Sequence, residues 1–198
     1  MKDKVKKYLD ELFPNAHCEL VYRNHFELLL AIVLSAQTTD VKVNSVTPTL
    51  FSKYPTPSDL ANANLLDVVE ILKPLGLANN KAKNIIATSK ILKDIKIPTT
   101  REELVKLPGV GRKTANVFLA EGLKQNAFAV DTHVSRVSNR LGISNSSDPL
   151  IIEKDLTMLF DEDDWIKLHH QMIFFGRYFC KAKNPNCKEC KLKEHCNF

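Results

Sequence analysis

The chain has 198 residues, enough for one large domain or two small ones, and its 44% hydrophobic and 26% charged residues are ordinary for a soluble globular protein. No apolar run reaches the roughly 18 residues of a membrane span, and the charged residues 1–7 are unlike a signal peptide, so we expect no membrane contact and a cytoplasmic location. The net charge is +5, of which +4 lies between Arg177 and the C-terminus.

Taken in chain order, the sequence predicts an all-α protein, because glycine is scarce and alternating apolar and polar runs are nearly absent. Residues 26–34 are apolar on almost all sides, which indicates a buried central helix. Thr100 to Glu103 form a capping-box pattern that opens a short helix ending at Pro108. Apolar spacing predicts the other helices over residues 3–13, 64–73, 79–94, 112–123, 131–141, 149–160 and 163–179.

A glycine-rich turn at residues 107–115, Leu-Pro-Gly-Val-Gly-Arg-Lys-Thr-Ala, joins two of these helices. Gly109 and Gly111 permit backbone angles that a β-carbon forbids, and they allow another molecule to approach closely. A Gly-x-Gly by itself is better explained as a purely structural corner. A capped helix before the turn and a second helix after it favour a DNA-backbone grip by Gly109, Val110 and Gly111, with N–H groups directed at phosphate.

Lys113 and Asp131 are the candidate reactive residues. Lys113 stands in the first turn of a predicted helix, where the helix dipole disfavours positive charge. A partly buried amine there would have a lowered pKa and serve as a nucleophile, although the position alone favours a simple phosphate contact. Asp131 precedes another helix as a candidate N-cap, and an ionised carboxylate there could also stabilise a cationic sugar.

Four cysteines crowd into residues 180–196, in the basic C-terminal segment, with the spacing C-x6-C-x2-C-x5-C: Cys180, Cys187, Cys190 and Cys196. In a cytoplasmic protein such a cluster indicates metal rather than disulfides. Zinc sites usually carry two separate C-x2-C pairs, and only one is present, so a [4Fe–4S] cluster fits better. Lys181 and Lys183 lie between the first two ligands and could meet DNA phosphates, whereas Cys18 stands alone.

Together these residues resemble the endonuclease III family of helix-hairpin-helix DNA glycosylases over residues 25–198. Lys113 and Asp131 are 18 positions apart, as in the family pattern, and the cysteine spacing matches the family's cluster loop. The other motifs that carry the resemblance are Leu34-Ser35-Ala36-Gln37-Thr38-Thr39-Asp40, Gly76-Leu77, the hairpin, and Val130-Asp131-Thr132-His133.

The resemblance implies a bifunctional DNA N-glycosylase and apurinic/apyrimidinic (AP) lyase that removes oxidised pyrimidines and cleaves the strand by β-elimination. Lys113 would form a Schiff base with the sugar, and Asp131 would support the cationic sugar and proton transfers. Gln37 would fill the gap left by the flipped nucleotide, Leu77 would wedge into the stack, and His133 would contact phosphate or support its helix.

The family fold implies two helical lobes with a DNA cleft between them. Residues 17–126 would form a six-helix lobe that holds the helix-hairpin-helix at 100–123. Residues 1–16 and 127–198 would form the lobe that holds the [4Fe–4S] cluster loop at 180–196. The expected partner is double-stranded damaged DNA, bound by a monomer, with a nucleoid association if the source is bacterial.

Two alternatives stay open from the sequence. An adenine-removing mismatch glycosylase shares the fold and the cluster, but that branch lacks the hairpin lysine and usually carries a further C-terminal domain. A non-catalytic DNA-binding module stapled by metal would bind abasic DNA without a covalent adduct. The presence of Lys113 speaks against the first, and only a trapping experiment separates the second.

Overall fold

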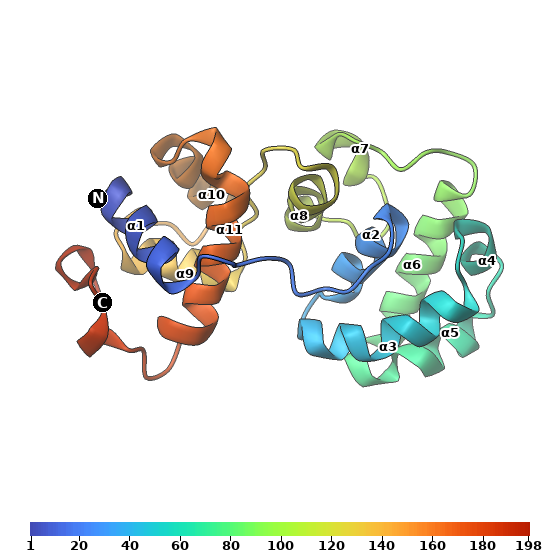
Figure 1. Cartoon of the computed structure of the whole chain (residues 1–198). Coiled ribbons are helices and arrows are strands. Elements are labelled where there is room, and N and C mark those ends of the chain that lie inside the picture. The colour runs from blue at the N-terminus through green and yellow to red at the C-terminus, as the bar shows by residue number, and fades with distance from the viewer. The chain divides into compact units, whose positions relative to one another are not determined.

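The computed structural model covers residues 1–198 and confirms the predicted all-α class, with eleven α-helices and no strand (Figure 1). No helix combines the length and the apolar character needed to cross a lipid bilayer. The bounds are α1 Lys2–Leu12, α2 His25–Leu34, α3 Asp40–Lys53, α4 Pro57–Ala61, α5 Leu65–Leu72, α6 Ala78–Leu92, α7 Arg101–Leu104, α8 Arg112–Leu123, α9 Thr132–Arg140, α10 Pro149–Leu159 and α11 Trp165–Phe174.

The chain divides into two compact units. The hairpin unit is Glu19–Leu123 and contains the seven helices α2 to α8, one more than the six predicted. The cysteine unit is Met1–Cys18 together with Lys124–Phe198, and it contains α1 and α9 to α11. These boundaries lie two and three residues from the predicted ones.

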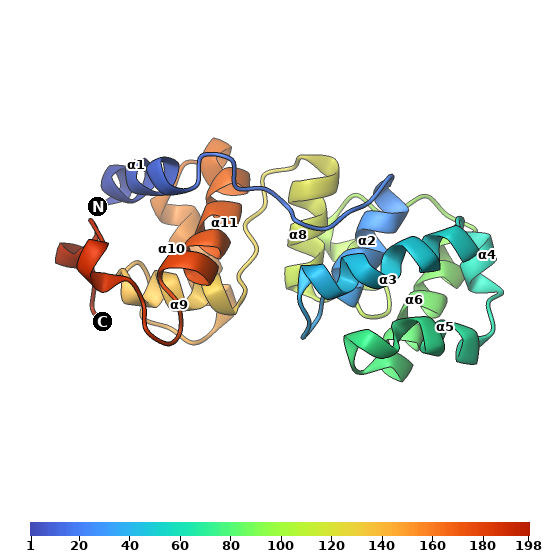
Figure 2. The same ribbon diagram turned by 60° about the horizontal axis from the view of Figure 1, so that its bottom comes forward.

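The hairpin unit is built around α2, in which every residue from Phe26 to Leu34 is buried, as predicted. Asn24 caps this helix by accepting the N–H of Glu27. α3, α6 and α8 pack against α2, and both views of the ribbon show them around it (Figures 1 and 2). α8, which carries Lys113, is therefore fixed on the central helix of its own unit.

Two helices of the hairpin unit were missed, α3 and α4. Pro48 interrupts the sequence of α3, yet Val43, Val46 and Leu50 still form a buried stripe with helical spacing. That burial outweighs the hydrogen bond lost at the proline, which normally breaks a helix. α4 begins at a capping box between Thr56 and Asp59, in which each side chain binds the other residue's backbone.

The capping box predicted at Thr100 is wrong. The Thr100 hydroxyl donates to the Glu103 carboxylate at 2.9 Å, and no side-chain bond caps the helix backbone. α7 covers only Arg101–Leu104 and ends before Pro108. Residues 105–109 run through turns into the hairpin.

The cysteine unit joins the two ends of the sequence. α1 packs against α11 in both views of the ribbon (Figures 1 and 2), and Val5 and Leu9 share a core with Met172. The single helix predicted over 163–179 is divided into a 3-10 turn at Glu162–Asp164, α11, and a π-helical turn at Phe175–Phe179. Single π turns of this kind are frequent at functional sites.

Candidate functional site

The hairpin depends on Gly109. Its φ of +79° lies in the left-handed region, and a β-carbon there would stand 2.9 Å from Asn84 Nδ2. Gly111 differs from the prediction, because its φ is ordinary and a β-carbon would meet nothing within 4 Å. Gly109 is thus required by the turn itself, whereas Gly111 leaves open space beside the backbone.

Val110, the middle residue of the predicted DNA-backbone grip, forms part of the turn itself. Its side chain is buried, and its N–H donates to the Leu107 carbonyl at 3.0 Å. The Thr88 hydroxyl of α6 donates to the Pro108 carbonyl at 2.9 Å and fixes the turn from behind. The donors available for a phosphate are therefore those of the first turn of α8, where N–H groups lack partners within the helix.

Lys113 is the second residue of α8, and its side chain is exposed. The sequence predicted a partly buried amine, whereas the amine of Lys113 is exposed in this chain alone. The first turn of α8 contains no acidic residue, so Lys113 has no acidic neighbour in that turn at the positive end of the helix dipole. The arrangement presents an accessible amine beside a helix N-terminus that attracts anions.

Asp131 is the N-cap of α9. Its Oδ1 accepts the N–H of Val134 at 2.8 Å, and its extended backbone places it just before the helix. The side chain is half-buried. The carboxylate is thus held in one orientation by the start of the helix that it stabilises.

His133 lies two residues further along. Burial lowers its pKa; the charge of Asp131 opposes this effect, and those of Arg136 and Arg177 add to it. Arg136 Nη2 stands 3.2 Å from His133 Nδ1, and guanidinium can only donate, so Nδ1 accepts and the proton lies on Nε2. A β-carbon at Gly176 of the π turn would come within 2.8 Å of His133 Cβ, so only glycine allows this packing.

Gln37 and Leu77 share an uncommon backbone geometry. Both are exposed and both have positive φ, 56° for Gln37 and 50° for Leu77. This conformation is a genuine outlier for a bulky residue such as leucine, and such strain tends to cluster at ligand-binding positions. Gln37 and Leu77 are thus exposed side chains on turns of uncommon backbone geometry, which Lys124 and Asn184 also adopt.

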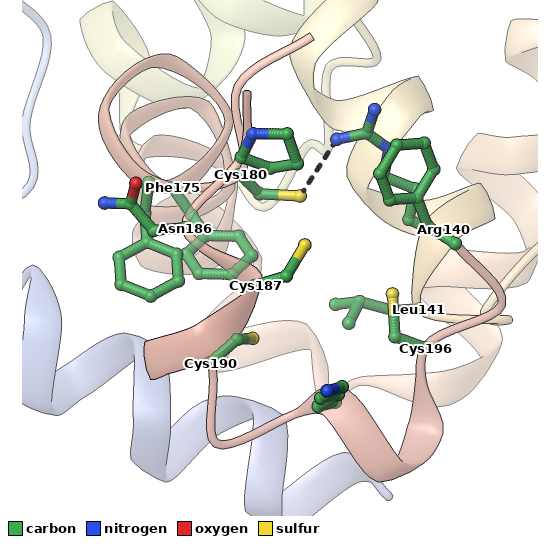
Figure 3. A pocket seen from close by; sticks show the side chains of 12 residues that line it. Arg140, Leu141, Phe175, Cys180, Asn186, Cys187, Cys190 and Cys196 are labelled. Carbon is green, nitrogen blue, oxygen red and sulfur yellow. Dashed lines mark hydrogen bonds between the residues drawn. The ribbon is translucent and has the colours of Figure 1, made fainter. Parts of the chain in front are cut away.

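The four C-terminal cysteines line one pocket, and their sulfur atoms stand around it in Figure 3. None forms a disulfide. Burial raises the pKa of the Cys190 thiol, and the other three sulfurs raise it further. Four sulfur atoms that line one pocket suit a site in which a cationic group binds thiolates.

α9 holds this loop through a residue that the sequence did not single out. Arg140 Nη1 lies 3.4 Å from Cys180 Sγ (Figure 3) and donates to the Lys181 carbonyl at 2.8 Å. Arg140 also stacks on the ring of Phe198. The side chains of Lys181 and Lys183 are exposed, whereas Cys18 is half-buried outside the pocket. The sequence did carry a sign of this role, because Arg136 and Arg140 stand one on each of the last two turns of α9.

Comparisons with known proteins place these features in context. Residues 30–162 match the model of the HhH-GPD superfamily of base excision DNA repair proteins. Endonuclease III of Bacillus subtilis (strain 168) is 50% identical over 192 residues, which cover 95% of this chain and 88% of that protein.

Two solved structures are similar over the whole chain. One is a non-covalent endonuclease III–DNA complex, at 48% identity and a TM-score of 0.93 over 95% of its chain. The other is a trapped endonuclease III–DNA covalent intermediate, at 46% identity and a TM-score of 0.94 over 96% of its chain. Both alignments cover 100% of this chain.

Proposed function

We propose how this chain, which belongs to the HhH-GPD superfamily of base excision DNA repair proteins, performs its DNA glycosylase and AP lyase activity. The protein binds DNA, and the damaged nucleotide must leave the base stack before its sugar can be attacked. We propose oxidised pyrimidines as its substrates, in keeping with the endonuclease III resemblance.

Lys113 is the nucleophile in this proposal. Its neutral Nζ attacks C1′, the glycosidic bond breaks, and the base leaves with a proton. Opening of the sugar ring then gives a Schiff base between Nζ and C1′. The iminium acidifies the C2′ proton, and loss of that proton breaks the C3′–O bond and releases the 3′ phosphate by β-elimination. Hydrolysis of the remaining imine returns the amine.

The other site residues support this reaction. Asp131 stabilises the cationic sugar and assists proton transfer, for which its fixed carboxylate is suited. Gln37 occupies the gap left by the flipped nucleotide and Leu77 enters the stack, since both are exposed in strained turns. His133, neutral with its proton on Nε2, donates to a phosphate.

The exposed amine of Lys113 directly behind the glycine turn carries the proposal. Borohydride should trap a covalent complex between the wild-type protein and duplex DNA that contains an abasic site or an oxidised pyrimidine. Lys113→Ala should lose trapping and at least about 10⁴-fold in strand cleavage, while it still binds the DNA. A wild type that gives no trapped complex would favour the non-catalytic module, and release of undamaged adenine opposite a lesion would favour the mismatch glycosylase.

The cysteine loop is proposed to hold a [4Fe–4S] cluster through Cys180, Cys187, Cys190 and Cys196. The four sulfurs stand around the pocket, and no three His, Cys, Asp or Glu side chains converge enough to hold a single ion. One zinc ion needs its ligands around one point, whereas a cluster takes one thiolate per iron. The cluster would fix the loop rather than join the reaction. Iron and inorganic sulfide in the purified protein would support it, and stoichiometric zinc would contradict it.

We further propose that the protein acts as a monomer on double-stranded DNA, in the cytoplasm, and at the nucleoid if the source is bacterial.

Lys181 and Lys183 are exposed on a loop whose carbonyls are held by Arg140, so they can meet phosphates with little ordering cost. Replacing both lysines by alanine should lower the salt dependence of DNA affinity by about two phosphate contacts. An unchanged salt slope would remove this loop from the DNA surface.

A further inference from the structure

Lys81 of α6 is a buried lysine that the proposed chemistry does not use. Its exposed fraction is only 5%, and burial lowers its pKa. Its ammonium group donates to the main-chain carbonyl of Leu75 at 3.2 Å. Burying an ammonium group without a carboxylate partner is unfavourable, so the residue calls for an explanation other than an ion pair.

The same residue binds the chain on both sides of a strained dipeptide. Gly76 and Leu77 follow each other with φ of 70° and 50°. The Lys81 side chain holds the carbonyl of Leu75 before them, and the Lys81 N–H donates to the carbonyl of Leu77 at 3.0 Å. A β-carbon at Gly76 would meet nothing within 4 Å, so neighbouring atoms do not impose this geometry there.

The bracketed dipeptide presents an exposed apolar side chain. The exposed fraction of Leu77 is 57%, although Leu75 beside it is buried. A left-handed leucine in a turn relaxes to ordinary angles unless its surroundings determine its conformation. The backbone bond is the ordinary first bond of α6, which any residue at position 81 would make, so the constraint specific to Lys81 is its side-chain bond to the Leu75 carbonyl. This bond fixes the turn from the buried side and keeps the Leu77 side chain directed outward before any DNA is bound.

We infer that Lys81 is a positioning residue that holds the Gly76–Leu77 turn ready for insertion of Leu77 into the DNA stack. The inference rests on the proposed role of Leu77. A preformed wedge spends less of the binding free energy on ordering the turn, so more of it is available to open the stack. Lys81 touches neither the DNA nor the reacting sugar in this proposal, and it acts through Leu77.

The test uses the full-length protein with its metal and a duplex that contains a stable abasic-site analogue next to 2-aminopurine, whose fluorescence rises on unstacking. Lys81→Met keeps the apolar stem and removes the donor. We expect a tenfold loss in the rate of the fluorescence rise, a similar loss in Leu77→Ala, and no further loss in the double variant. Lys90→Met, which removes an exposed charge from the same helix, should stay within twofold of wild type.

If the fluorescence of the duplex rises with Lys81→Met at the wild-type rate, the inference is overturned. It is also overturned if the two losses multiply in the double variant, because Lys81 would then act independently of Leu77. If Lys81→Met does not fold, the same cycle is measured with Lys81→Leu, whose apolar side chain also lacks a donor. A loss that disappears in the Leu77→Ala background supports the inference, and any other result overturns it. Borohydride trapping by the wild type separately reports whether the proposed function stands.

Discussion

The starts of α8 and α9 solve the same local problem in opposite ways. α8 follows Gly111, which has no side chain to cap it, and its first turn carries Arg112 and Lys113 without an acidic residue. α9 follows Asp131, whose carboxylate binds the N–H of Val134. A negative group at a helix N-terminus is favourable and a positive one is not. The proposed nucleophile therefore opposes the stability of its helix, whereas the proposed acidic partner supports it.

This difference separates activity from stability in a measurable way. At α8 a substitution that ends the chemistry should leave the fold intact or more stable. At α9 the carboxylate has two roles, and substitutions must be chosen to divide them. Active sites commonly trade stability for function, but here only one of the two helix starts does so.

The sharpest division is at Asp131. Asparagine caps a helix about as well as aspartate, so Asp131→Asn should keep the thermal stability and lower single-turnover strand cleavage by roughly 10²- to 10⁴-fold. Asp131→Ala should lose the same activity and about 1 kcal/mol of stability in addition. Near-normal cleavage by the asparagine variant would leave Asp131 as a cap alone.

Loss of the proposed cluster should affect only the α9 side of the comparison. Arg136 and Arg140 of α9 bind carbonyls of the cysteine loop, so Cys190→Ser should loosen α9 together with the loop. We expect the backbone amides of α9 to exchange hydrogen at least about tenfold faster in this variant, which corresponds to a loss of about 1.4 kcal/mol in the free energy of local opening. The amides of α8, which packs on α2, should keep their protection. Equal loosening of both helices would contradict the separation.

The two hairpin glycines test the α8 start in the same manner. Gly109→Ala combines a left-handed backbone with a clash against Asn84, so it should cost about 1–3 kcal/mol and weaken DNA binding. Gly111→Ala should change stability by no more than about 0.5 kcal/mol, because its surroundings are open. It should still weaken DNA binding, since its methyl group occupies the approach to the backbone. Unchanged affinity for duplex DNA would show that the backbone does not approach there.

Local signals in the sequence were sufficient for the two helix starts. The bounds of α8 match the predicted residues 112–123, and the cap at Asp131 is where the sequence indicated it. Both depend on a few adjacent residues, a glycine turn in one case and an aspartate before a helix in the other. The burial of Val110 and the exposure of Lys113 were not predicted, because burial depends on how whole helices pack.

The contacts that support α9 could not be read from the sequence. Arg140 reaches Cys180 across 40 positions, and Gly176 packs on His133 from a π turn that interrupts the apolar periodicity. Lys81 has an ordinary position in a helical pattern, and only the structure shows that it is buried. Each of these features depends on packing between elements distant in sequence, which periodicity and capping signals do not encode.

The smallest predicted effect measures most directly how the charge of Lys113 opposes the dipole of α8. Lys113→Gln removes one charge with little change in helix propensity, so it should raise stability by about 0.3–1 kcal/mol at low salt while it abolishes trapping. Lys90 lies in the last turn of α6, where the dipole favours a cation, so Lys90→Gln should lower stability by a similar amount and leave trapping intact. Thermal unfolding at low and high salt measures both, because screening should shrink the two changes together. Stability changes of the same sign would show that the dipole does not act on Lys113, and the amine would then have no structural cost at the place where the chemistry requires it.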